Sequence, residues 1–188
     1  MSVQRRYTSR DLDALPDIEG IRYEIIDGEL HVSKAPGLEH QHVCVQLTTA
    51  IQIWISALGF GRVYGGPGLV FSEDNDVIPD VIWITQDRLR IGRDASSHIT
   101  VGPELAIEVL SPGSANERRD RESKLALYSR RGVNEYWIVD WRRHTVDVFR
   151  RVDEALTRVA TLGDGETITS LLLPGFELPV VGLWEPES

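Results

Sequence analysis

The feature that most constrains the fold is an apolar run, a helical pattern and a second apolar run in direct succession. The apolar runs cover residues 104–111 and 135–140, and the helical pattern covers 114–131. Ser114 and Glu117 fit a capping box at the start of this helix. Because a strand–helix–strand connection favours parallel strands in one sheet, the sequence predicts an α/β fold.

The residues around this unit predict a β-hairpin before it and antiparallel strands after it. Asp-Gly at 27–28 is a strong hairpin signal between the arms 22–26 and 29–33. The most regular helical spacing covers 40–58, and Gly59 ends it. The other predicted elements are a short helix at 8–15 and strands at 62–71, 77–84, 144–150, 156–162 and 166–170, whereas 85–103 is an irregular connection and the tail from Pro174 shows little periodicity.

The length and composition of the chain are those of one domain. The 188 residues are 41% hydrophobic, which supports one well-packed core, whereas two would be cramped. We therefore expect a single domain over residues 1–188. The single cysteine, Cys44, excludes an internal disulfide and favours a reducing compartment. The chain has no run that approaches the roughly 18 apolar residues of a membrane span and no apolar signal-peptide core. We expect a cytoplasmic protein that does not contact a membrane.

The net charge of −9 argues at first against a nucleic-acid partner. The charges are unevenly distributed, however. Residues 152–188 carry seven acids and one base, whereas residues 115–131 carry six bases and three acids. The acidity is therefore mostly C-terminal, and the central helix is basic. A solvated helix face remains the alternative to contact with an anionic partner.

Two carboxylates stand in apolar strand segments, where an uncompensated charge is costly. Asp80 follows Pro79 at the head of one apolar run, and Glu108 lies inside the next, with Ala106 and Leu110 on its own face. Two acids at corresponding places on successive strands favour a site for a hard divalent cation and a phosphate. The alternatives are a turn residue for Asp80 and a core acid paired with an arginine for Glu108.

Three further residues are candidates for the same site. Lys124 is one of only two lysines and shares a helical stripe with Asp120 and Tyr128. The ammonium group of a lysine is a point charge, which suits a water or a phosphate oxygen better than planar arginine does. The alternative is that Lys124 and Asp120 form an ordinary surface ion pair. His40 begins the long helix, where an anion is favoured, or is a surface residue. Glu24 is either a third acid of the site or a half-buried hairpin acid.

Several common catalytic motifs are absent from the sequence. It has no Walker-type glycine loop, no Gly-x-Ser-x-Gly elbow, no His-Glu-x-x-His motif and no cysteine pair. These absences argue against a nucleotide kinase, a nucleophilic hydrolase and a zinc protein of the familiar kinds.

An ordered set of short segments extends over about residues 5–180. The set consists of Tyr-Glu-Ile-Ile-Asp-Gly-Glu at 23–29, His40, Pro-Asp-Val at 79–81, Glu-Val-Leu-Ser-Pro at 108–112, Asp120, Lys124, Tyr128 and Gly-Val-Asn-Glu-Tyr-Trp at 132–137. In this set the chain resembles the Uma2 family, also called DUF820, of restriction endonuclease-like proteins. The family belongs to the PD-(D/E)xK nuclease superfamily. The resemblance implies an α-β-β-β-α-β core, here with an N-terminal β-hairpin and C-terminal antiparallel β additions.

The resemblance also assigns the acids. It implies that Asp80 is the acid of the PD motif and that Glu108 is the second acid. The superfamily lysine would stand at position 110, where this chain has Leu110. In families of this kind the lysine has moved to the following helix, which points to Lys124.

The function implied by the resemblance is a Mg²⁺-dependent endonuclease that hydrolyses phosphodiester bonds of DNA, with Mn²⁺ as a substitute ion. The expected catalytic residues are Asp80, Glu108, Lys124, Glu24 and His40, and the expected metal ligands are Asp80, Glu108 and the backbone carbonyl of Val109. A homodimer would supply two sites for two strands. The alternatives are a non-catalytic interaction module that retains the nuclease fold, and a nuclease for RNA or a small phosphodiester.

Overall fold

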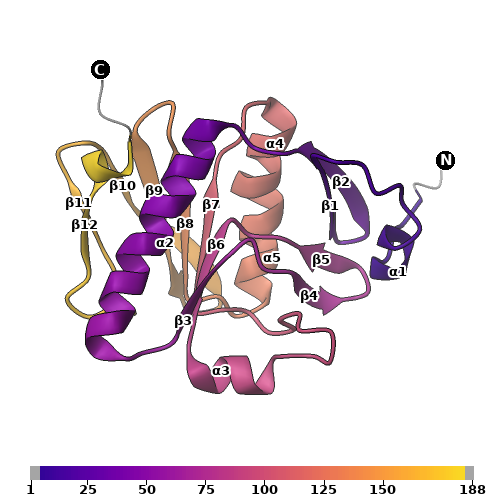
Figure 1. The fold of residues 1–188 in the computed structure, drawn as a ribbon, viewed down its shortest axis with the longest axis horizontal. Helices are drawn as coiled ribbons and strands as arrows, with labels where there is room; N and C mark the ends of the chain where they lie inside the picture. Colours follow the sequence, from indigo (N-terminus) through magenta and orange to yellow (C-terminus); the bar gives the residue numbers. More distant parts are fainter. Residues whose placement is uncertain (1–4, 185–188) are drawn as a thin grey trace.

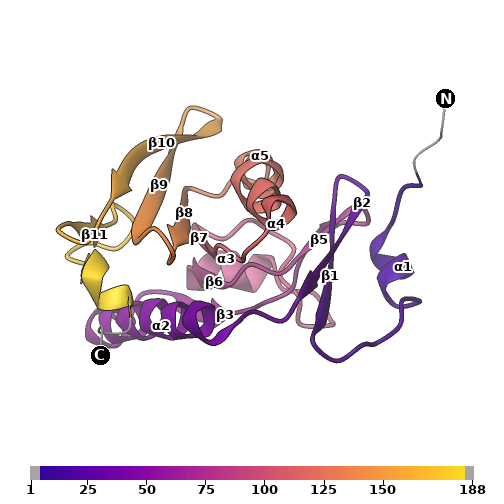
Figure 2. The same ribbon diagram turned by 90° about the horizontal axis from the view of Figure 1, so that it is seen from above.

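A six-stranded sheet carries helices on both of its faces (Figures 1 and 2). This computed structural model describes residues 5–184. The strand order is β10-β9-β8-β7-β6-β3. Helix α2 (Leu38–Leu58) covers one face, and the helical segment 114–130 covers the other. The strands are β3 (Arg62–Gly65), β6 (Val81–Ile84), β7 (Leu105–Val109), β8 (Glu135–Asp140), β9 (Thr145–Val152) and β10 (Ala155–Leu162).

The strands on either side of the helical segment 114–130 are parallel, as the sequence predicts. In the register of β7 and β8, Ile107 lies opposite Trp137, and the other neighbouring pairs of this sheet are antiparallel. All residues of β7 and β8 are buried, which is typical of strands covered on both faces. The predicted α/β crossover is therefore confirmed.

A second sheet contains the predicted hairpin. Its strand order is β2-β1-β5-β4. At the hairpin turn Asp27 has φ of 50° and Gly28 has φ of 79°, a left-handed pair that Asp-Gly adopts readily. Helix α1 (Ser9–Leu12) lies beyond this sheet at the N-terminal end of the molecule (Figure 1). The strands are β1 (Ile21–Ile26), β2 (Glu29–Lys34), β4 (Leu69–Ser72) and β5 (Asn75–Val77).

Two predicted strands are each divided between the two sheets. The run 62–71 breaks at Gly66 and the proline after it, into β3 and β4, and the run 77–84 breaks at Pro79, into β5 and β6. A proline has no N–H to donate to a strand partner, and Gly66 has φ of 63°. The chain passes from one sheet to the other at both breaks. Asp80 therefore lies at the junction of the sheets.

The helix predicted over 114–131 contains a π turn. Its parts are α4 (Ser114–Arg118), the π-helical η1 (Arg119–Lys124) and α5 (Leu125–Arg130). π turns are rare and occur frequently at functional sites. The capping-box prediction is wrong, because Gly113 is the N-cap and no side chain caps the helix. Glu117 instead accepts a hydrogen bond from Arg142 Nη2 at 2.6 Å.

The C-terminal segment contributes more to the core than its sequence predicts. It contains β11 (Thr167–Thr169), its antiparallel partner β12 (Glu177–Pro179) and the 3₁₀ helix η2 (Val180–Leu183). Val180 and Leu183 are fully buried in the cluster that includes residues of α2. β11 lies within the strand predicted at 166–170. β12 lies in the tail from Pro174, and its three residues are too few to show a periodic pattern. Helix α3 (Gln86–Ile91) likewise lies in the connection predicted to be irregular.

The helices of the fold bear on the expectation that the chain has no membrane span. Within residues 5–184, no helix combines the length and the apolar character needed to cross a bilayer. The cytoplasmic location and the homodimer stay predictions.

Val180→Ala should lower the free energy of unfolding by about 1.5–3 kcal/mol, because it removes buried methyl groups and leaves a cavity. The melting temperature should fall by about 2–4 °C for each kcal/mol. Val181→Ala is the matched control, since Val181 is 57% exposed, and its effect should stay within about 0.5 kcal/mol. Urea and thermal denaturation measure both. Equal losses would contradict the packing of η2 described above.

Candidate functional site

Both sheets, α2 and η1 contribute residues to one cavity of about 20 Å³, room for about one water molecule or ion. All the predicted site residues, with Val109, line this cavity. They are Glu24 of β1, His40 of α2, Asp80 at the sheet junction, Glu108 of β7 and Lys124 of η1. The structure thus brings together residues that are far apart in the chain. Their catalytic roles stay predictions.

Asp80 is held in place by both α2 and β7. Its Oδ2 accepts a hydrogen bond from the backbone N–H of Val109 at 2.8 Å and lies 3.2 Å from His40 Nε2. Arg22 Nη1 lies 3.9 Å from its Oδ1. Burial raises the pKa of Asp80, but the hydrogen bond and charge of His40, with the charge of Lys124, lower it by more, so the pKa lies below its ordinary value. Asp80 is therefore an ionised carboxylate whose hydrogen bonds to residues 5–184 are at Oδ2.

Glu108 points away from α2 because side chains alternate along β7. Leu105, Ile107 and Val109 pack in the α2 cluster. Glu108 Oε1 accepts hydrogen bonds from Lys124 Nζ at 2.9 Å and Tyr128 Oη at 2.8 Å.

The electrostatics of Glu108 are unusual for a strand residue. Burial and the negative charge of Asp80 raise its pKa well above the ordinary 4.5, although Lys124 acts in the opposite direction. Within residues 5–184, the hydrogen bonds that Glu108 accepts are all at Oε1. Oε2 is therefore available to a ligand in the cavity, and a cation there would favour the charged carboxylate.

Lys124 places an ammonium group between two carboxylates. Its side chain is 1% exposed, and Nζ lies 2.8 Å from Glu24 Oε1 and 2.9 Å from Glu108 Oε1. Nζ also contacts the carbonyl oxygen of Ile78 at 3.5 Å. Burial lowers the pKa of Lys124, but Glu108, Glu24 and Asp120 raise it by more, so the ammonium stays charged. The π turn η1 buries Asp120 and Lys124 together on the inner side of the helix.

Glu24 and Arg119 complete the ion-pair network. Glu24 Oε1 accepts from the backbone N–H of Ile78 at 2.8 Å, and Oε2 lies 3.2 Å from Arg119 Nη1. Arg119 Nε also donates to Asp120 Oδ1 at 2.8 Å. Burial raises the pKa of Glu24, but Lys124 and Arg119 lower it below its ordinary value. Glu24 therefore serves as a charged partner that fixes the position of Lys124.

Sequence reasoning did not identify Arg119, Arg22 or Cys44 as site residues. Arg22 lies two residues before Glu24 on β1 and so shares its face, a usable signal. Cys44 lies one helical turn after His40, which is also a usable signal. Arg119 had no signal beyond its place beside a candidate acid, because arginine is common in this helix.

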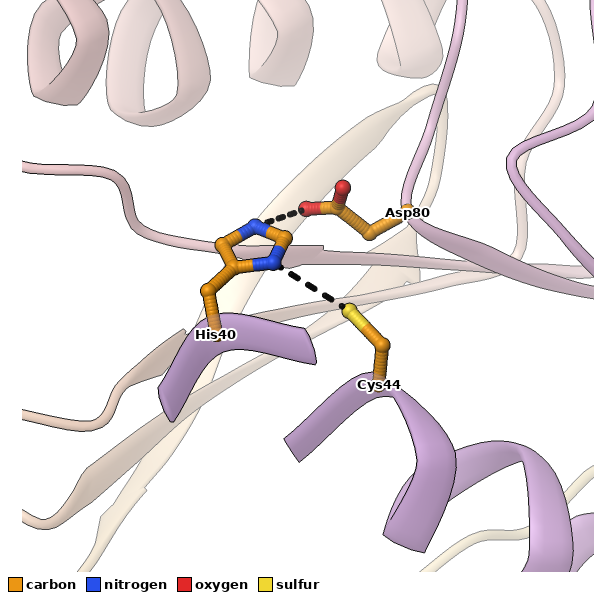
Figure 3. A group of neighbouring side chains, drawn as sticks. All are labelled: His40, Cys44 and Asp80. Atoms are coloured by element: carbon orange, nitrogen blue, oxygen red, sulfur yellow. Dashed lines mark hydrogen bonds and ion pairs between the residues drawn. The ribbon is translucent and has the colours of Figure 1, made fainter. Parts of the chain in front are cut away.

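His40 connects Asp80 to Cys44 (Figure 3). Its Nδ1 lies 3.5 Å from Cys44 Sγ, and its Nε2 faces Asp80. Burial, with the charges of Asp80 and Glu108, raises the pKa of the Cys44 thiol far above its ordinary value. The thiol is therefore protonated and lies within hydrogen-bonding distance of Nδ1. The two ring nitrogens of His40 thus face two different residues.

The charges around the cavity fit a hard divalent cation. Glu24, Glu108 and Asp120 are buried and Asp80 is nearly so, whereas the buried cations are Arg119 and Lys124. Carboxylates exceed cations among these buried side chains, whereas the less buried Arg22 and Lys34 also line the cavity. Carboxylate oxygens are the ligands that Mg²⁺ and Mn²⁺ prefer. The expected carbonyl ligand, Val109, lines the cavity as well, and its role stays a prediction.

Comparisons with known proteins agree on one family. Uma2, described as "Putative restriction endonuclease", matches residues 10–181. The crystal structure of "a putative nuclease belonging to DUF820 from Anabaena variabilis ATCC 29413" is similar, with a TM-score of 0.72 and 18% sequence identity over 94% of this chain and 96% of that chain. At this identity the likeness shows the fold alone, and it confirms the predicted restriction endonuclease-like core. No curated protein matches the chain.

Mg²⁺ or Mn²⁺ should stabilise the folded protein, because a cation offsets the repulsion among these carboxylates. An ion at ten times its Kd should add about 1.4 kcal/mol to the free energy of unfolding. Glu108→Gln should raise the melting temperature of the metal-free protein and remove the response to metal, since it replaces a disfavoured buried charge with a neutral amide. Thermal melts with and without metal measure both effects.

The matched control for this prediction is Glu122→Gln, because Glu122 is an exposed acid on the same π turn. It should keep the metal response of the wild type. A wild-type melting temperature that millimolar Mg²⁺ and Mn²⁺ leave unchanged would count against a metal site here.

Proposed function

Because the chain belongs to the Uma2 family, described as "Putative restriction endonuclease", we propose that it is a Mg²⁺-dependent endonuclease that hydrolyses phosphodiester bonds of DNA. The observation that carries the proposal is the contact of Lys124 Nζ with Glu108 at 2.9 Å, in a cavity whose wall also contains Asp80. An acid pair and an ammonium group in one small cavity are the groups that this reaction requires.

Each site residue has a separate task in this proposal. Asp80, Glu108 and the carbonyl of Val109 would hold Mg²⁺, or Mn²⁺ in its place. When bound, the ion would polarise the scissile phosphate and lower the pKa of a water molecule. Lys124 would orient Glu108 and stabilise the negative charge that develops on the phosphate. Glu24 would fix Lys124 through their 2.8 Å contact.

His40 has a positioning task in the same scheme. Its Nε2 lies 3.2 Å from Asp80 Oδ2, the oxygen that also accepts from the Val109 N–H. Both contacts are made by Oδ2. They fix the carboxylate and leave Oδ1 to bind the ion. Orientation of a ligand carboxylate by hydrogen bonds is a common feature of metal sites.

Leu110 does not argue against catalysis. It is fully buried in an apolar cluster with Leu127 and Tyr128. A lysine at position 110 would place its ammonium group among these apolar side chains. Since Lys124 reaches Glu108 from the helix above β7, the cavity has its ammonium group from another element.

The support for a nucleic-acid substrate comes from the rim of the cavity. The positive charges of the central helix are largely paired with acids of the protein, as in the part-buried contact of Arg121 with Asp147 at 2.6 Å and the exposed contact of Arg130 with Asp27 at 2.7 Å. Arg22 and Lys34 also line the cavity and would meet the phosphates of a polyanion. We propose DNA as this polyanion, and a homodimer in the cytoplasm as the working form.

Glu108→Gln and Lys124→Arg should each lower the rate of Mg²⁺-dependent plasmid cleavage by at least about a hundredfold. The first removes a metal ligand, and the second replaces a point charge with a planar fork that cannot occupy the same position. Nicking and linearisation of supercoiled plasmid at saturating Mg²⁺ measure the rate, and thermal melts show whether each variant is folded.

Glu122→Gln is again the control and should cut at the wild-type rate. A chelator should stop cleavage, and RNA and a small phosphodiester should be cut more slowly than DNA. If the folded wild type binds metal but cuts none of these substrates, the non-catalytic module becomes the better description of the protein. If Lys124→Arg cuts at the wild-type rate, the assignment of Lys124 is wrong.

A further inference from the structure

We propose that His40, Cys44 and Asp80 form a second metal site, selective for a thiophilic divalent ion such as Zn²⁺ or Cd²⁺, and that this ion competes with Mg²⁺ for Asp80. This set adds a thiol and an imidazole to Asp80, whereas the catalytic cavity adds Glu108 and the carbonyl of Val109. Asp80 would thus belong to both a hard-metal site and a soft-metal site.

The geometry of the three side chains carries this inference (Figure 3). The His40 ring lies between the other two residues, with Nε2 at 3.2 Å from Asp80 Oδ2 and Nδ1 at 3.5 Å from Cys44 Sγ. One ligand atom from each residue lies within 4.8 Å of the others. Among residues 5–184, no other set of three His, Cys, Asp or Glu side chains meets this spacing. An ion bound by all three side chains would take one ring nitrogen of His40 and would draw the three ligand atoms in to bond lengths of about 2.0–2.3 Å.

The chemistry of the ligands determines which ion each set prefers. A thiolate and an imidazole are soft or borderline ligands, and together with one carboxylate they suit Zn²⁺ or Cd²⁺. Asp80 with Glu108 offers only oxygen, which suits Mg²⁺ and Mn²⁺. When the ion binds, Cys44 loses its proton to solvent and the metal–sulfur bond replaces the S–H bond.

Two cavities meet at Asp80. The 20 Å³ cavity is lined by Asp80 and Glu108 but not by Cys44. A larger cavity of about 330 Å³ is lined by Asp80 and Cys44 but not by Glu108. The larger cavity gives an ion access to the thiol and leaves room for water to complete its coordination. His40 lines the smaller cavity together with Glu108, so the two ligand sets share Asp80, and Cys44 is the ligand that only the larger cavity reaches.

The consequence is competition between the two kinds of ion. A soft ion that occupies Asp80 removes a ligand from the catalytic cavity, so Zn²⁺ or Cd²⁺ should inhibit cleavage at a fixed Mg²⁺ concentration. The inhibition rests on the proposed function. The binding of the soft ion does not, and it can be measured without any substrate.

Cd²⁺ is the probe for binding, because a cadmium–thiolate bond absorbs in the ultraviolet. The chain has one cysteine, so this absorption reports Cys44 alone. We expect one equivalent of Cd²⁺ to produce the absorption in the wild type and in Glu108→Gln, and none in Cys44→Ala. Asp80→Asn should weaken Cd²⁺ binding by more than about tenfold, a loss that even outer partners of metal ligands cause.

Two results would overturn the site. One is the absence of the absorption in the folded wild type. The other is equal Cd²⁺ affinity in the wild type and Asp80→Asn, which would mean that the thiol binds the ion without the carboxylate.

The activity measurement uses the same variants. Zn²⁺ should inhibit Mg²⁺-dependent cleavage by the wild type. Cys44→Ala, compared with its own rate in the absence of Zn²⁺, should resist this inhibition by about tenfold or more. Equal inhibition of the two proteins would overturn the competition at Asp80. A wild type that does not cut DNA, but binds Cd²⁺ through Cys44 and Asp80, would contradict the proposed function and support the second metal site.

Discussion

The way the two sheets and the helical segment 114–130 pack together depends on the ion pairs of the buried Lys124 ammonium group. This group joins Glu24 of the hairpin sheet, Glu108 of the central sheet and the helix that carries it. Removing this cation would cost about 3–5 kcal/mol, because it would leave the buried carboxylates that it pairs uncompensated. Without this cation, the acids of the two sheets would repel one another at the point where the sheets meet. The same group thus holds the fold together and supplies the positive charge of the site.

The elements that were predicted correctly are those with a repeating pattern longer than a few residues. Alternation along β7 places Glu108 on the face opposite α2, and Asp27 with Gly28 fixes the hairpin. The predictions failed where a single residue changes the direction of the chain. Pro79 divides one apolar run between two sheets, and the run itself has no feature that distinguishes a bent strand from a straight one. β12 and η2 near the C-terminus have no pattern of their own, and they are set by contacts with β11 and α2 respectively.

The sequence indicates a site residue where its type is unusual for the segment or for the chain. Asp80 and Glu108 stand out because carboxylates are costly in apolar runs, and Lys124 stands out because lysine is scarce in this chain. Cys44 has the spacing of an ordinary apolar helix residue, and Arg119 is one arginine among several. The position of Arg119 beside Glu24 arises from how η1 packs against the hairpin sheet, and no local pattern encodes that packing. Cys44 lies beside His40 because the two are one turn apart on α2, a spacing that the sequence does contain.

The π turn has a consequence for how this helix tolerates changes in length. A π turn closes its hydrogen bonds over five residues where an α-helix uses four, so η1 accommodates one residue more than a regular helix would. Deleting one residue there would give a continuous α-helix whose two ends still face the same way, because the π turn already absorbs the additional residue. Asp120 and Tyr128 would then be seven positions apart and would stay on one face, since seven α-helical residues turn the chain by about 700°. A deletion in α5 ahead of Tyr128 has no such reserve and would turn Tyr128 away from Glu108 by about 100°. The length of this helix is therefore tolerant of change inside η1 and intolerant of it one turn later.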